Sequence, residues 1–115
     1  MERIENAGLP AIEIYYEPRS ALLAEAVGYG IEEEGLPSRL IAGIATYEEA
    51  YELTRQAGLG VAVMVKENRA AVFTRQLKEQ KPLFEITITK MEEAKSIGKN
   101  AARIVKRKPF IDLDR

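Results

Sequence analysis

The spacing of hydrophobic residues divides this chain into short apolar runs and longer segments with a helical repeat. Apolar runs of strand length occur at residues 12–16, 39–44, 61–65, 70–74 and 83–88. Apolar residues recur at every third or fourth position over residues 20–34, 46–57 and 89–106, which is the repeat of an amphipathic helix. The pattern therefore predicts the element order β-α-β-α-β-β-β-α.

The run at residues 61–65 is apolar at every position, as expected for a central strand covered on both faces. A turn at residues 66–69 would return the chain antiparallel to it over residues 70–74. The order of elements then predicts an α/β fold with three layers, in which a mixed five-stranded sheet lies between helices. Because there is no linker, low-complexity segment or repeat, we expect one domain over residues 1–115.

Two helices begin with a capping-box pattern, in which a Thr at the helix start is followed three residues later by Glu. Thr46 and Glu49 form one such pair, and Thr89 and Glu92 form the other. Pro109 ends the last helix. The faces expected to be buried are Ala50, Leu53, Thr54 and Ala57 in the first of these helices, and Ala94, Ile97, Ala101, Ile104 and Val105 in the second.

Basic residues crowd the C-terminal half of the last helix, at Lys99, Arg103, Lys106, Arg107 and Lys108. Cations at this end of a helix interact favourably with its dipole. The cluster could also bind phosphates, but it lacks the interleaved aromatic residues typical of nucleic-acid surfaces. Compensation of the helix dipole is therefore the favoured interpretation.

Gly28 and Gly30 both interrupt the first predicted helix, and each lowers its helix propensity by about 1 kcal/mol relative to Ala. Helix packing is the favoured explanation for both. Gly30 lies on the apolar face of the helix, so we expect it to permit a close approach to the sheet.

The composition excludes several classes of enzyme. The chain has 17 basic and 18 acidic residues and neither histidine nor cysteine. It therefore lacks the commonest general base and metal ligand, and it can form no thiolate nucleophile, disulfide or cysteine-based zinc site. The N-terminal residues show no signal-peptide core and the longest apolar run is too short to span a bilayer, so we expect a cytoplasmic protein that is not itself an enzyme.

Glu32, Glu33 and Glu34 stand together at the end of the first helix, which Gly35 and Pro37 terminate. Carboxylates in a last turn face the negative end of the helix dipole, at about 0.3–1 kcal/mol each when exposed. On a helical wheel Glu32 falls opposite the apolar stripe, Glu34 on its centre and Glu33 at its margin. A solvated helix end would explain the run, but a bound cation or a basic partner surface would offset its cost.

Four segments of the chain resemble motifs of one protein family and follow the order that they have in that family. They are Gly-Ile-Glu-Glu-Glu-Gly-Leu-Pro at residues 30–37, Pro-Leu-Phe at 82–84, Ile-Gly-Lys-Asn-Ala-Ala-Arg-Ile-Val-Lys at 97–106, and Pro-Phe at 109–110. The sequence resembles the small (β) subunit of diol/glycerol dehydratase-reactivating factors. The resemblance implies a fold like that of anticodon-binding domains, which agrees with the predicted element order.

The resemblance also implies a function. Such a small subunit is non-catalytic and pairs with a large, Hsp70-like ATPase subunit that binds ATP and ADP. The complex acts in a chaperone-like way on a coenzyme B12-dependent dehydratase and releases damaged cobalamin through an exchange of subunits. The residue corresponding to the family's Mg²⁺-binding glutamate is Glu33, and its neighbours Glu32 and Glu34 would share the interface with the large subunit.

This sequence departs from the family pattern in its lack of histidine and at Arg107-Lys108, where a glycine is usual. The alternative is the medium (β) subunit of the dehydratase itself, which carries similar motifs but normally has a longer N-terminal extension. A separate RNA-binding domain of the anticodon-binding type is disfavoured by the net charge of −1. The substrate of the dehydratase, a location inside a bacterial microcompartment and self-association of the isolated chain stay open.

Overall fold

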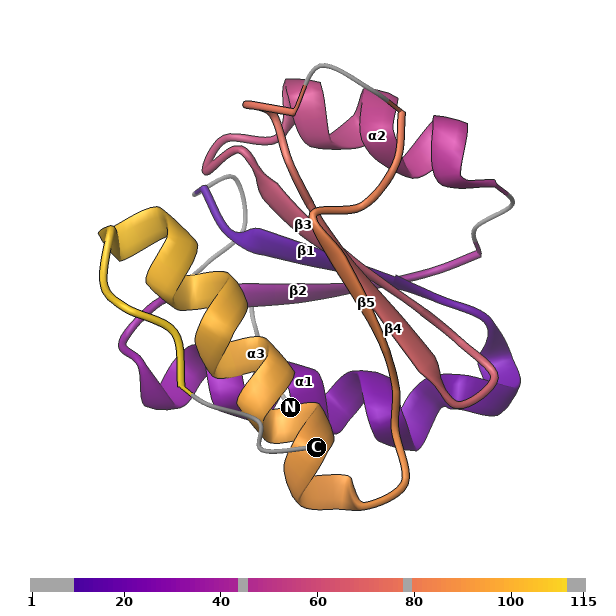
Figure 1. The fold of residues 1–115 in the computed structure, drawn as a ribbon. Coiled ribbons are helices and arrows are strands. Elements are labelled where there is room, and N and C mark those ends of the chain that lie inside the picture. Colours follow the sequence, from indigo (N-terminus) through magenta and orange to yellow (C-terminus); the bar gives the residue numbers. More distant parts are fainter. Residues whose placement is uncertain (1–9, 44–45, 78–79, 112–115) are drawn as a thin grey trace.

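The computed structural model describes residues 10–43, 46–77 and 80–111. Its elements follow the predicted order, with one added turn of 3-10 helix, η2 (Figure 1). They are β1 (Ile12–Tyr16), η2 (Pro18–Ser20), α1 (Ala21–Glu33), β2 (Ser38–Ala42), α2 (Tyr47–Gln56), β3 (Val61–Lys66), β4 (Arg69–Thr74), β5 (Phe84–Thr87) and α3 (Met91–Lys106). The end of the strand predicted at residues 39–44 lies outside the described residues.

The five strands form one mixed sheet in the order β2-β1-β3-β4-β5. Strand β1 is parallel to both β2 and β3, whereas β4 is antiparallel to β3 and β5. Helices α1 and α3 lie against one face of the sheet and α2 lies against the other (Figure 1). The structure thus confirms the three-layer fold with a mixed five-stranded sheet.

Strand β3 is buried on both faces, as its uninterrupted apolar sequence predicts. Val61, Val63 and Val65 belong to the larger core beneath α1 and α3. Met64 points to the other face, where it packs with Phe73 of β4 and with residues of α2. This two-sided burial is the reason why the strand has no polar alternation.

The buried face of α2 differs from the one predicted. Ala50 and Thr54 are buried, but Leu53 is 40% exposed and Tyr51 takes its place against the sheet. The Tyr51 hydroxyl donates a hydrogen bond to the main-chain carbonyl of Leu77, which satisfies its polar end. An amphipathic tyrosine therefore replaces a leucine in this layer of the core.

The capping box of α3 is shifted by one residue from the prediction. The helix begins at Met91, so its third residue is Glu93 instead of Glu92. The Glu93 carboxylate accepts hydrogen bonds from the main-chain amides of Thr89 and Lys90, and also from the Thr89 hydroxyl. The expected Thr46–Glu49 pattern at α2 is present, with the Glu49 amide donating to Thr46 Oγ1.

The close approach at Gly30 is to α3, and the expectation that it faces the sheet is wrong. A Cβ atom at Gly30 would lie 2.0 Å from the main-chain oxygen of Lys95 in α3. Gly98 of α3 is in the reciprocal position, where a Cβ would lie 2.0 Å from the main-chain oxygen of Val27 in α1. It is Gly28 that faces the sheet, next to the side chain of Ser38. The two helices therefore pack backbone to backbone at this crossing.

Candidate partner-docking site

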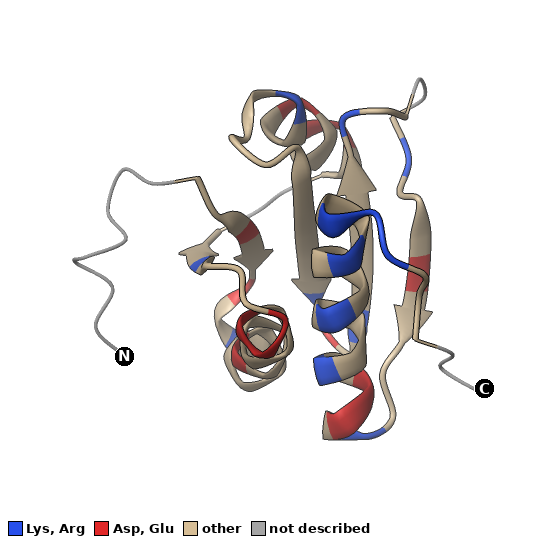
Figure 2. Cartoon of the chain, turned by 90° about the vertical axis from the view of Figure 1, so that its left-hand side faces the viewer, with Lys and Arg blue, Asp and Glu red and all other residues tan. Residues whose placement is uncertain are grey.

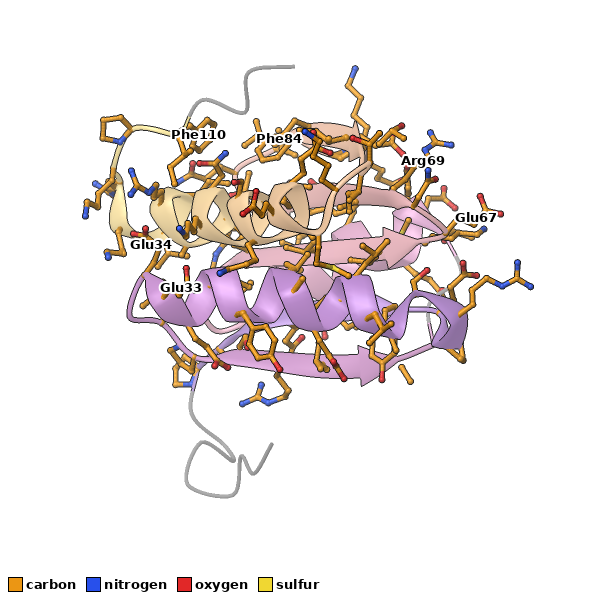
Figure 3. All side chains as sticks on the ribbon, turned by 90° about the horizontal axis from the view of Figure 1, so that it is seen from below. Glu33, Glu34, Glu67, Arg69, Phe84 and Phe110 are labelled. Atoms are coloured by element: carbon orange, nitrogen blue, oxygen red, sulfur yellow. The ribbon has the colours of Figure 1, made fainter. Side chains whose placement is uncertain are left out.

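The end of α1 lies against the basic side of α3, and six side chains meet there. We call this set the charged seam: Glu33, Glu34, Lys95, Lys99, Arg103 and Lys106. Figure 2 shows the acidic end of α1 beside the column of basic residues along α3. Figure 3 shows Glu33 and Glu34 directed from α1 toward α3. The close crossing of the two helices brings these opposite charges within reach of each other.

Glu33 holds two lysines of α3 that are one helical turn apart. Its two carboxylate oxygens lie 2.9 Å from Lys95 Nζ and 3.2 Å from Lys99 Nζ. The pKa of the Glu33 carboxyl lies below its ordinary value, mainly because of the hydrogen bond from Lys95 and secondly because of the one from Lys99. The same hydrogen bond to Glu33 raises the pKa of Lys95. The Glu33 side chain is nevertheless 45% exposed, so these pairs border on solvent.

Glu34, the C-cap residue of α1, is held more deeply than Glu33. Its side chain is only 11% exposed, and it accepts from Arg103 at 3.0 Å and from Lys106 at 3.5 Å. The hydrogen bond from Arg103 is the main reason why the pKa of the Glu34 carboxyl lies below its ordinary value. Lys106 Nζ also donates to the main-chain carbonyl of Glu34 at 2.6 Å, which satisfies an acceptor at the end of α1.

Glu32 is half-buried, whereas the helical wheel placed it in solvent. The hydroxyl of Ser38, at the start of β2, donates a hydrogen bond of 2.8 Å to its carboxylate. Three adjacent glutamates thus have three different partners: Ser38 of a strand for Glu32, two lysines for Glu33, and an arginine and a lysine for the more deeply placed Glu34. The cost expected at the helix end is offset within the chain by α3.

This arrangement adds a second role to the one inferred for the basic cluster. Lys99, Arg103 and Lys106 pair with carboxylates of α1. Arg103 and Lys106 also lie in the last turn of α3, where cations interact favourably with the helix dipole. Arg107 has a different role, because it is the C-cap of α3 with φ 59° and ψ 42°. That left-handed conformation favours glycine.

Residues 108–111, which we call the C-terminal strap, fold back along α3. The buried Asn100 side chain donates to the main-chain oxygen of Ile111 at 3.1 Å and accepts from its amide at 2.7 Å. Arg103 donates to the main-chain oxygen of Pro109, and the Phe110 ring meets the Phe84 ring edge to face (Figure 3). Sequence reasoning missed this contact; a polar Asn on the buried face of a helix was its one signal.

Arg103 joins the strap to the charged seam. One of its terminal nitrogens donates to Pro109 of the strap, and the other donates to the Glu34 carboxylate. The guanidinium can make both bonds because its donors are fixed in a planar fork. The position of the strap is therefore coupled to the acidic end of α1.

Among the described residues, no group of three or more acidic side chains is placed to hold a metal ion. Glu33 could supply one or two oxygens, but Mg²⁺ takes six ligands in an octahedral arrangement. The missing ligands would have to come from water or from another molecule. Within the described part of the chain, no helix is long and apolar enough to cross a membrane.

Comparison with known proteins gives the class of this protein. The sequence model of the dehydratase medium subunit family matches residues 9–111, and the chain belongs to this family. The small subunit of the diol dehydratase-reactivating factor of Klebsiella michiganensis is 34% identical over 112 residues, which is 95% of this chain and 90% of that protein. The small subunit of the propanediol dehydratase-reactivating factor of Salmonella typhimurium is 34% identical over 94% of this chain and 96% of its own length.

Solved structures show the same relationship. A chain in the structure of the diol dehydratase-reactivating factor complexed with ADP and Mg²⁺ is 32% identical to this protein and has a TM-score of 0.79. The match covers 91% of this protein and 100% of the other chain. A chain of glycerol dehydratase reactivase has a TM-score of 0.80 at 23% identity, over 91% of this chain and 99% of that one, and so supports the fold. These findings confirm the resemblance to reactivating factor small subunits. A small subunit implies a larger partner subunit.

Proposed function

We propose that this chain is the non-catalytic small subunit of an ATP-dependent reactivase that serves a coenzyme B12-dependent diol or glycerol dehydratase. The large partner subunit would be an Hsp70-like ATPase that binds ATP and ADP, and catalysis would take place there. The chain would act in the cytoplasm or in a bacterial microcompartment. The complex would release damaged cobalamin from the dehydratase so that intact coenzyme replaces it.

One observation carries this proposal. The chain matches a family described as the dehydratase medium subunit over residues 9–111, and it is also 34% identical to a reactivating factor small subunit over 95% of its length. Similarity to both kinds of protein is what an exchange of subunits requires, because the two must be able to occupy the same surface in turn. The small subunit would leave the large subunit and the medium subunit of the dehydratase would take its place.

The charged seam is the surface that we propose for docking, with Glu32, Glu33 and Glu34 at the interface. Glu33 is the exposed member, and its carboxylate suits a single ligand position in a Mg²⁺ site completed by the large subunit. A bound Mg²⁺ would supply positive charge that links carboxylates of the two chains. Glu34 is held at 11% side-chain exposure by Arg103 and Lys106 and would instead shape the end of α1.

The direct test is a pull-down of the tagged chain from its native cells, followed by identification of its partner. We expect a large ATPase subunit. The complex should be weakened by Glu33→Ala in the presence of Mg²⁺, while Glu52→Ala on the exposed side of α2 should leave it unchanged. If Glu33→Ala leaves the Mg²⁺-dependent affinity as it is in the wild type, the assignment of Glu33 to the metal site is wrong.

The medium subunit of the dehydratase is the second candidate, and the description of the matching family favours it. This alternative predicts a stable complex with a cobalamin-binding large subunit and turnover of a diol by that complex. Recovery of such a partner in the same pull-down, with no ATPase, would establish the alternative in place of the reactivase.

A further inference from the structure

Positive charge is concentrated on α3 although the chain as a whole is nearly neutral. Of the 17 basic residues, six lie between residues 95 and 108, at Lys95, Lys99, Arg103, Lys106, Arg107 and Lys108. On the opposite face of the sheet, α2 carries Glu48, Glu49 and Glu52 against Arg55. The side view in Figure 2 shows the basic column running along α3 next to the end of α1. The molecule therefore presents a basic face on the side of the charged seam.

Within the seam, positive charge exceeds negative charge. Glu33 and Glu34 are each shared by two cations, so four basic side chains face two carboxylates. The pairs differ in their exposure to solvent. The carboxylates differ clearly, because Glu33 is 45% exposed and Glu34 is 11% exposed. The cations differ less, at 39% for Lys95 and 30% for Lys99 against 23% for Arg103 and 31% for Lys106. The Glu33 pairs are therefore the ones that can separate at low cost, because exposed ion pairs contribute little to stability.

We infer that Lys95 and Lys99 exchange Glu33 for carboxylates of the partner when the seam docks, so that the surface recognised by this face is acidic. The inference rests on the proposed function, in which Glu33 turns toward a cation and the large subunit. Once Glu33 is engaged there, both lysines lose their partner at the moment when the interface excludes water. Leaving them unpaired would be costly, so the facing surface must supply Asp or Glu side chains.

The charges of the seam favour an acidic protein surface over a nucleic acid. Glu33 and Glu34 stand among the basic residues and would repel a phosphate backbone. Residues 95–108 contain no aromatic side chain on which bases could stack. Individual Asp and Glu side chains of a protein can be placed to meet each lysine while avoiding the two glutamates. The resulting complementarity would also speed association at low salt.

The test compares the wild type with Lys95→Gln/Lys99→Gln for binding to the large subunit that co-purifies with the chain. Affinities are measured by calorimetry with Mg²⁺, at low and at physiological ionic strength. We expect the double variant to bind about tenfold more weakly at low ionic strength and to lose most of the salt dependence. Lys95→Arg/Lys99→Arg keeps both charges and should bind within about threefold of the wild type. Lys66→Gln, at the exposed end of β3, is the control for a general change of charge.

The sign of the effect is decisive. If the lysines only competed with the partner for Glu33, their removal would tighten the complex. Tighter binding or an unchanged affinity of the double variant would overturn the inference. Neither result would count against the proposed function. If the wild type binds no large ATPase subunit, the proposed function fails and the inference fails with it. Salt-dependent binding of single-stranded poly(U) RNA that the double variant loses would assign the face to nucleic acid. Thermal unfolding by circular dichroism verifies that each variant is folded.

Discussion

Gly30 of α1 and Gly98 of α3 lie opposite each other's helix backbone, and each leaves room for a main-chain carbonyl of the other helix. A Cβ at either position would stand 2.0 Å from that oxygen, at Lys95 for Gly30 and at Val27 for Gly98. This crossing brings Lys95 and Lys99 to Glu33. The charged seam thus depends on two residues without side chains.

We expect Gly98→Ala to destabilise the protein by about 3 kcal/mol, because the added methyl meets backbone that cannot move without separating the helices. Gly28→Ala is the matched control on α1. Its Cβ would lie 3.2 Å from the Ser38 hydroxyl oxygen, a side-chain atom that can shift, and the gain in helix propensity offsets the contact. Urea unfolding should place Gly28→Ala within about 1 kcal/mol of the wild type. Equal losses in the two variants would contradict this account of the crossing.

Replacement of Arg107 by glycine should stabilise the protein by about 1 kcal/mol, because Arg107 has φ 59° at the end of α3 and glycine adopts that conformation without strain. The gain would appear as a higher midpoint of urea unfolding, while the slope of the free energy of unfolding against urea concentration stays unchanged. Lys108→Gly removes the next basic residue at a position without positive φ and should give no gain. Stabilisation by both variants would indicate relief of charge repulsion instead of backbone strain.

Asn100→Ala should release the C-terminal strap. The variant loses both hydrogen bonds to Ile111, and we expect a loss of about 1–2 kcal/mol because water can reach the freed main chain once the strap lifts. Hydrogen exchange at the Ile111 amide, followed by NMR, should become much faster. Phe110→Ala removes only the ring contact with Phe84 and should leave that amide protected. Retained protection in Asn100→Ala would show that Asn100 does not hold the strap.

The charged seam should make the free energy of unfolding depend on pH in the acidic range. The pKa of Glu34 in the folded chain is held below 4.5, chiefly by Arg103. A lowered pKa means that the folded state favours the charged carboxylate, so its contribution is present above the ordinary pKa and is lost as pH falls through the folded value. Between about pH 6 and pH 3, Glu34→Gln should therefore lose less stability than the wild type. If the urea midpoints of the wild type and of Glu34→Gln fell by the same amount across this pH range, the ion pairs of Glu34 would be ruled out as the cause of the pH dependence.

The amino-acid sequence was enough to predict the main strands and helices, their order along the chain and the three-layer arrangement. Period-two and period-3.6 patterns report which side of a segment is apolar, and that information is local to each segment. The uninterrupted apolar run of β3 even indicated burial on both faces. The helical wheel put Glu34 on the apolar stripe, but Glu34 is the C-cap of α1 and is shielded by Arg103 and Lys106 of α3. Family motifs then pointed to reactivating factor small subunits, which the comparisons confirm.

The contacts between residues of different elements could be learned only from the folded structure. A helical pattern shows that Gly30 is on the inner face of α1, but it does not show whether a strand or a helix lies there. In the same way, Lys99 and Arg103 could not be assigned to Glu33 and Glu34, because ion pairs between α1 and α3 span more than 60 residues of sequence and depend on how closely the helices cross. The strap held by Asn100 has no periodic signal. Local patterns carry the burial of each face, whereas contacts between elements come from the packing of the whole chain.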